Sequence, residues 1–134
     1  MDKTAEDLVD FTLETKFDTL SEATIEACKN RLLDTIGCLA GGFNHPVFMA
    51  ARKFGGRFMM EKPATILGTG ISTSPDMAAF ANSVGIRVLD MNDNYRVKSG
   101  GHPSDVIGAL FAGSEIGEKS GPSFLTAMAI GYEI

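Results

Sequence analysis

Four prolines in this chain each follow a residue suited to the start of a helix, and this pattern constrains the fold more than any other feature. The four pairs are His45-Pro46, Ser74-Pro75, His102-Pro103 and Gly121-Pro122. Proline is favoured at the first helical position because its missing N–H has no intrahelical partner there in any case. A fifth helix start is predicted near the N-terminus, where Thr4 and Asp7 resemble a capping box ahead of an apolar run.

A sixth helix is predicted from the spacing of apolar residues in the first third of the chain. They recur at steps of three and four, as on one face of a helix: Ile25, Cys28, Leu32, Ile36 and Leu39. Ser21 is suited to cap the start of this helix, and Gly41-Gly42 to end it, because glycine accepts the left-handed conformation common there. The segment therefore indicates one long helix.

Only residues 64–67 read as a strand, bounded by Pro63 and Gly68. A lone strand is not stable by itself, so this segment either pairs with something absent from the chain or is an extended loop. The predicted fold is therefore all-α, a bundle of about six helices in one domain spanning residues 1–134.

Composition and charge exclude several classes of protein. With 44% hydrophobic and 22% charged residues, the chain is typical of a soluble globular domain. A net charge of -5 gives no basic patch for nucleic acid, and no apolar run approaches the length of a membrane span. Cys28 and Cys38 fall on one predicted helix about 15 Å apart, too far for a disulfide. Together with an N-terminus that lacks a signal-peptide pattern, this predicts a cytoplasmic protein.

The chemistry-bearing residues concentrate in segment 87–105, which joins acids, amides and one of the two histidines in a glycine-broken loop. His102 falls at a predicted helix start, where an imidazole can take or give a proton near neutral pH, with Asp90 or Asp93 as a partner. A plainer reading stays open, because His-Pro is also a simple helix start and Asp-x-Asn-Asp-Asn is a good turn sequence. A metal site from His45, His102 and the two aspartates is conceivable, but no tight ligand spacing supports it.

The same segment resembles the signature of 2-methylcitrate dehydratases of the MmgE/PrpD superfamily. The residues that carry the resemblance are Asn82, Arg87, Leu89-Asp90, Asn92-Asp93 and His102-Pro103-Ser104-Asp105. Supporting matches extend over nearly the whole chain: Asp34-Thr35-Ile36-Gly37-Cys38, Ala78-Ala79-Phe80-Ala81-Asn82 and Gly131-Tyr132-Glu133-Ile134.

The resemblance implies an enzyme that makes or breaks bonds next to a carboxylate of a small polycarboxylate, without a metal or organic cofactor. It implies catalytic roles for Asp90 and His102. We expect the substrate to be bound by Arg87, Asp93, Asn94 and Ser104, with Arg96 and Lys98 as further nearby cations. Asn94 stands where many members carry threonine, a departure that concerns substrate orientation.

The resemblance also implies that a lid domain and further basic and histidine side chains of the pocket are absent from this chain. Two hypotheses follow. The chain is either the N-terminal part of a dehydratase-like lyase, weakly active or inactive alone, or a non-catalytic helical module for oligomerisation or binding. In both cases we expect a homo-oligomer or association with a complementary chain, because a partial fold exposes apolar surface.

Overall fold

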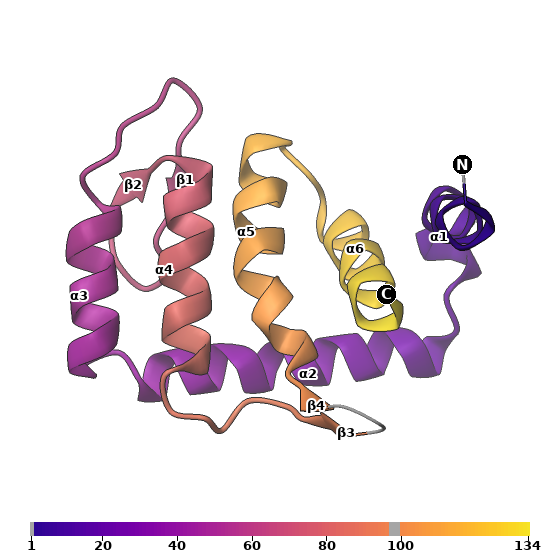
Figure 1. The fold of residues 1–134 in the computed structure, drawn as a ribbon, viewed down its shortest axis with the longest axis horizontal. Coiled ribbons are helices and arrows are strands. Elements are labelled where there is room, and N and C mark those ends of the chain that lie inside the picture. The colour runs from indigo at the N-terminus through magenta and orange to yellow at the C-terminus, as the bar shows by residue number, and fades with distance from the viewer. Residues whose placement is uncertain (1, 97–99) are drawn as a thin grey trace.

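The computed structural model describes residues 2–96 and 100–134 and is mostly helical, as predicted (Figure 1). Within these residues there are six α-helices: α1 (Lys3–Glu14), α2 (Glu22–Gly41), α3 (Pro46–Gly55), α4 (Pro75–Arg87), α5 (Ile107–Ile116) and α6 (Gly121–Glu133). Two short 3-10 helices accompany them, η1 (Phe17–Thr19) and η2 (Pro103–Val106). None of the helices in the described part of the chain combines the length and apolar character needed to cross a membrane.

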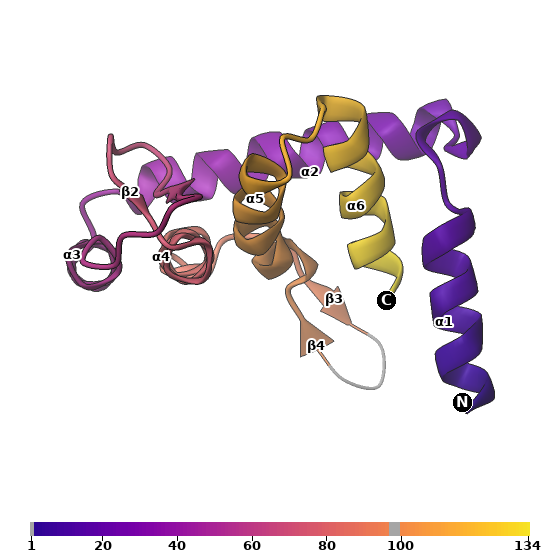
Figure 2. The same cartoon turned by 90° about the horizontal axis from the view of Figure 1, so that it is seen from above.

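The long helix α2 is the support on which the other helices are arranged. It runs along one edge of the molecule, and α3, α4, α5 and α6 all lie on the same side of α2 (Figures 1 and 2). The first helix, α1, stands apart at one end and contains no buried residue. The core therefore belongs to α2 through α6.

Five large apolar side chains, each at most 1% exposed, form the centre of this core: Phe48, Ile66, Ile86, Ile107 and Met128. They come from α3, α4, α5, α6 and the segment between α3 and α4, so each of these four helices contributes one of them. Burying each such side chain stabilises the fold by about 1.5–3 kcal/mol.

The helix starts follow the sequence pattern with three corrections. Helix α6 begins at Gly121 after the cap Ser120, so Pro122 is its second residue and not its first. The Ser21 hydroxyl accepts from Thr24 N at 3.0 Å at the start of α2, as predicted. The first helix begins one residue before Thr4, because the Asp2 carboxylate accepts from Thr4 N and acts as the cap. At His102-Pro103 the chain forms η2 first and α5 begins only at Ile107, because the backbone bond from Asp105 N returns three residues, to His102 O. The His102 side chain bonds elsewhere and makes no cap.

Segment 64–67 finds its strand partner within the chain, which corrects the expectation of an unpaired strand. Strand β1 (Ala64–Thr65) pairs antiparallel with β2 (Ser72–Thr73), and Gly68 makes the intervening turn with a φ of +73°. The buried Asn82 of α4 fixes this hairpin, since its Nδ2 donates to Thr65 O at 3.0 Å and its Oδ1 accepts from Leu67 N at 2.8 Å.

A second small hairpin lies in the chemistry-bearing segment. Strand β3 (Tyr95–Arg96) pairs antiparallel with β4 (Gly100–Gly101), just before η2. It is exposed and projects from the helical body beside α5 (Figure 2).

Helices α4 and α5 approach closely at Gly108. A Cβ added there would lie 2.7 Å from Ser83 N and 3.0 Å from Ala79 O, both of which are backbone atoms that cannot move aside cheaply. The Ser83 hydroxyl also donates to Asp105 O at 3.0 Å, which fixes η2 to α4. This contact sets the position of α5 relative to the end of α4.

Gly108→Ala should therefore destabilise the protein by about 1–3 kcal/mol, the usual cost of overpacking a tight contact. Gly113→Ala is the matched control on the same helix, because a Cβ there meets no atom within 4 Å. The control should raise stability by about 0.5–1 kcal/mol through helix propensity. Urea denaturation followed by circular dichroism measures both, and equal effects of the two substitutions would contradict the close approach.

Candidate functional site

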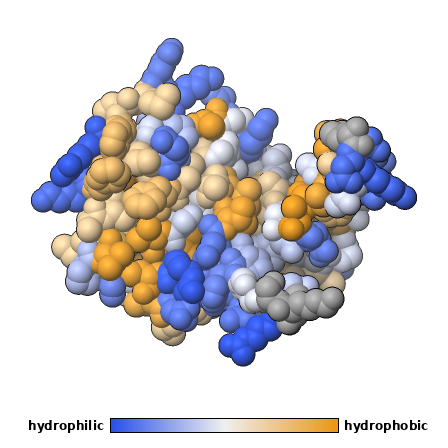
Figure 3. Space-filling view, viewed as in Figure 1, coloured by the Kyte–Doolittle hydropathy of each residue, from blue (hydrophilic) through white to orange (hydrophobic). Residues whose placement is uncertain are grey.

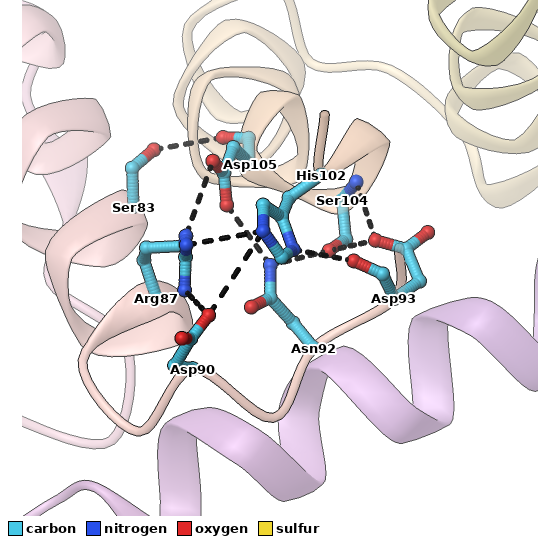
Figure 4. Close-up of polar contacts among 8 residues, drawn as sticks. All are labelled: Ser83, Arg87, Asp90, Asn92, Asp93, His102, Ser104 and Asp105. Atoms are coloured by element: carbon cyan, nitrogen blue, oxygen red, sulfur yellow. Dashed lines mark hydrogen bonds and ion pairs between the residues drawn. The ribbon is translucent and has the colours of Figure 1, made fainter. Parts of the chain in front are cut away.

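The loop between α4 and η2 brings the predicted catalytic residues to one place (Figure 4). Arg87 is the last residue of α4, and Asp90 follows in a left-handed conformation with a φ of 54°. Aspartate tolerates this conformation better than most residues, and Asp90 N donates to Arg87 O at 2.9 Å to close the turn. The turn directs the Asp90 side chain back toward the end of α4.

Arg87 bridges the groups around it through three different nitrogens. Nη1 pairs with Asp90 Oδ1, Nη2 lies 3.0 Å from His102 Nε2, and Nε lies 3.8 Å from Asp105 Oδ2. His102 Nε2 and Asp90 Oδ1 are 3.9 Å apart. The sequence placed Asp90 and His102 near one another, as observed, but did not predict that Arg87 joins them.

Hydrogen bonding fixes which nitrogen of His102 carries the proton when the ring is neutral. His102 Nδ1 lies 2.6 Å from Asp93 O, a carbonyl that can only accept, so Nδ1 is the donor. Nε2 then presents a lone pair, which accepts from Arg87 Nη2. The nitrogen that faces Asp90 is thus the one able to take a proton.

A partly buried hydrogen-bond network, centred on the buried Asn92 and Ser104, supports this arrangement. Asp93 Oδ1 accepts from Ser104 N at 3.0 Å and from Ser104 Oγ at 2.5 Å. Asn92 Nδ2 donates to Ser104 Oγ and to Asp105 Oδ1, both at 2.9 Å. The Asn92 amide cannot be reversed, because the Asp105 carboxylate requires a donor opposite it.

The network leaves one acceptor unused. Asn92 is only 5% exposed, and its Oδ1 has no hydrogen-bond partner within the described residues. An unsatisfied buried carbonyl costs about 1–3 kcal/mol. The geometry of this loop is therefore maintained against a local cost.

The residues expected to bind substrate fall into two groups. Arg87 is partly exposed, and Asn94 and Arg96 lie on the surface. Ser104 is 0% exposed and its N–H and hydroxyl are both used by Asp93, so here it holds the loop together. Lys98 lies outside the described residues.

Sequence reasoning missed three residues that support the site: Ser83, Asn92 as a buried donor, and Tyr132. Asn92 stands between two acids in a turn sequence, where a solvated turn role is the ordinary expectation. Tyr132 reaches the site from the far end of the chain. Burial, and then the neighbouring Asp93 carboxylate, raise the pKa of the Tyr132 phenol well above its usual range. Its hydroxyl is buried without a hydrogen-bond partner in the described structure.

The site is an open surface feature, while two large cavities lie elsewhere. The Asp90 side chain is 73% exposed and that of Arg87 is 37% exposed. One cavity of about 710 Å³ lies between α1, η1, α2 and α6, where Tyr132 forms part of its wall. Another of about 640 Å³ lies between α2, α5 and the β1–β2 turn. Over residues 2–96 and 100–134, no three histidine, cysteine, aspartate or glutamate side chains are grouped to hold a metal ion.

Comparison with known proteins adds to this geometry. The profile of the MmgE/PrpD N-terminal domain matches residues 6–134. A 2-methylcitrate dehydratase from Cupriavidus necator is 31% identical over 115 residues, which cover 83% of this chain and 23% of that protein. The 2-methylcitrate dehydratase of Escherichia coli is 30% identical, with the same two coverages.

A third relative carries a different name. The cis-aconitate decarboxylase-like protein oryM of Aspergillus oryzae is 28% identical over 134 residues, which cover 95% of this chain and 28% of that protein. This chain thus spans about a quarter of the length of the relatives it matches.

The two histidines should show opposite tautomers in their neutral states. His102 Nδ1 donates to Asp93 O, whereas His45 Nδ1 accepts from Val47 N at 3.3 Å, so His45 must carry its proton on Nε2. Long-range ¹H–¹⁵N correlation spectra distinguish the two forms, and His45→Gln assigns the signals. A neutral His102 protonated on Nε2 would contradict the arrangement of the loop.

Proposed function

The chain belongs to the MmgE/PrpD family, and from this premise we propose that it carries part of the active site of a carbon–oxygen lyase. The proposed reaction resembles that of a 2-methylcitrate dehydratase, in which a proton is removed next to a carboxylate of a small polycarboxylate and hydroxide leaves. The observation that carries the proposal is the meeting of Arg87, Asp90 and His102 at one exposed point.

His102 is the proposed base. Proton transfer needs an acceptor held in a fixed direction, and the bond from Nδ1 to Asp93 O supplies that direction. The lone pair on Nε2 then points to the exposed side, where Asp90 lies 3.9 Å away. Asp90 is the proposed second group, which orients the substrate or stabilises the charged ring.

Arg87 is the proposed anchor for a substrate carboxylate. A guanidinium binds carboxylates through paired N–H donors, and such charge-assisted bonds are stronger than neutral ones. Asn94 follows Asp93 on the surface and is proposed to bind a substrate hydroxyl. The proposed step uses side chains alone, without a metal or organic cofactor.

The open position of the site supports weak activity in this chain alone. Enzymes gain much of their rate by aiming fixed donors at developing charge in a place from which water is excluded. Here Asp90 is largely exposed, and the chain spans 23% of the two dehydratases described above. We propose that a complementary part of the protein or a partner chain covers the site.

The experiment is turnover of 2-methylcitrate and citrate, followed by the ultraviolet absorbance of the unsaturated product. His102→Gln should lower the rate by about 100-fold or more, the usual contribution of a positioned base. His45→Gln is the matched control, because this second histidine only caps α3. Absence of turnover and of substrate binding at high protein concentration would contradict the proposal.

A second candidate function, a non-catalytic module for association, is favoured by the exposed apolar surface. Helix α1 buries no residue, yet Leu8, Val9 and Leu13 lie together beside a shallow apolar groove. Apolar side chains also gather over α3 and α4 (Figure 3), where the Phe54 ring centroid lies 5.5 Å from that of Phe58. Exposed apolar surface of this kind marks sites of association.

Self-association is therefore expected at micromolar concentration by light scattering. Leu13→Glu should shift the protein toward monomer, because it places a charge in the apolar groove of α1. Asp10→Asn, a polar change on the same helix, is the control and should leave the mass unchanged. A strictly monomeric wild-type protein would contradict this candidate.

The proposed location is the cytoplasm. Both cysteines, Cys28 and Cys38, are buried and free. Burial raises the pKa of each thiol, which keeps both of them protonated and unreactive near neutral pH. Free buried thiols suit a reducing compartment.

A further inference from the structure

We infer that Arg87 blocks the proposed base in the arrangement described above, and that a substrate carboxylate frees this base by replacing Asp90 on the guanidinium. The inference rests on the proposed function, because its ligand is the same small polycarboxylate. It assigns Arg87 a role beyond that of an anchor, since the arginine also decides when His102 becomes available as a base.

The contacts of the guanidinium show how the base is blocked. Nη1 pairs with Asp90 and Nη2 is 3.0 Å from His102 Nε2, so one cation engages both proposed reacting groups (Figure 4). The lone pair of Nε2 accepts from Arg87 and is not free to take a proton from a substrate. In this arrangement His102 is not available as a base.

Of the two carboxylates that face Arg87, Asp105 is fixed by further hydrogen bonds and Asp90 is not. Asp105 is anchored from behind, because its Oδ1 accepts from the buried Asn92 Nδ2 at 2.9 Å and its backbone oxygen accepts from Ser83. The Asp90 side chain is 73% exposed, and within the described residues it contacts Arg87 and His102 alone. Asp90 is therefore the partner that an incoming carboxylate can replace.

When a substrate carboxylate replaces Asp90, His102 becomes available as a base and its ring keeps its orientation. Asp90 offers the guanidinium only Oδ1, at Nη1. A carboxylate of the substrate offers two oxygens to the outward guanidinium nitrogens and draws the guanidinium toward itself. Asp105 remains near Nε at 3.8 Å, and His102 stays oriented through Nδ1 and Asp93 O at 2.6 Å. The Nε2 lone pair loses its donor and faces the substrate, so only a carboxylate ligand exposes the base.

The test uses propane-1,2,3-tricarboxylate, an unreactive tricarboxylate, titrated into the intact chain. Calorimetry gives the dissociation constant, and the ¹⁵N resonance of His102 Nε2 reports loss of the hydrogen bond from Arg87. Asp90→Asn removes the internal competitor and keeps the backbone conformation, because asparagine also tolerates a positive φ. It should tighten binding by about two- to five-fold, the range expected for an exposed ion pair.

The control variant is Glu61→Gln, which makes the same change of net charge in the exposed loop before β1 and should leave the affinity unchanged. Equal or weaker binding by Asp90→Asn than by the wild type would overturn the inference and leave the proposed function standing. A ligand that binds without moving the His102 Nε2 resonance would overturn it as well. Failure of both the wild type and Asp90→Asn to bind would overturn the inference and the proposed function together.

Discussion

The candidate site depends on the hydrogen bonds between Asp93 and the residues at the start of η2. The Asp93 backbone carbonyl accepts from His102 Nδ1, and its carboxylate accepts from both the N–H and the hydroxyl of Ser104. One residue thus closes the loop, sets the tautomer of the histidine and draws its ring away from a capping role. The His102 side chain makes no capping bond at the start of η2, because it is already engaged.

The site divides into a buried half and an exposed half with different physical characters. Asn92 and Ser104 are almost fully buried, and the hydrogen bond between their side chains fixes both residues. Arg87 and Asp90 are open to solvent, where an ion pair is worth little and can be exchanged. The buried half thus fixes the orientation of His102, while the exposed ion pair can be exchanged for a ligand. This combination suits a base that acts only when a ligand is bound.

Helix starts and the nearness of Asp90 to His102 could be predicted because both depend on local chemistry. Proline at a first helical position and a serine cap act within one turn of the chain. The strand at residues 64–67 was predicted, but its pairing with β2 could not be, because a two-residue strand is too short to show an alternating pattern. Tyr132 was missed as a neighbour of Asp93 for a different reason, since only the tertiary packing of α6 brings it there.

The isolation of α1 carries a practical consequence for handling the protein. Because no residue of this helix is buried, its loss or replacement removes little of the apolar burial that stabilises the core. An affinity tag or fluorescent label is therefore best attached before α1, at the end of the molecule from which the helix projects. The opposite terminus is a poor choice, because α6 ends one residue after Tyr132, beside the carboxylate that organises the loop.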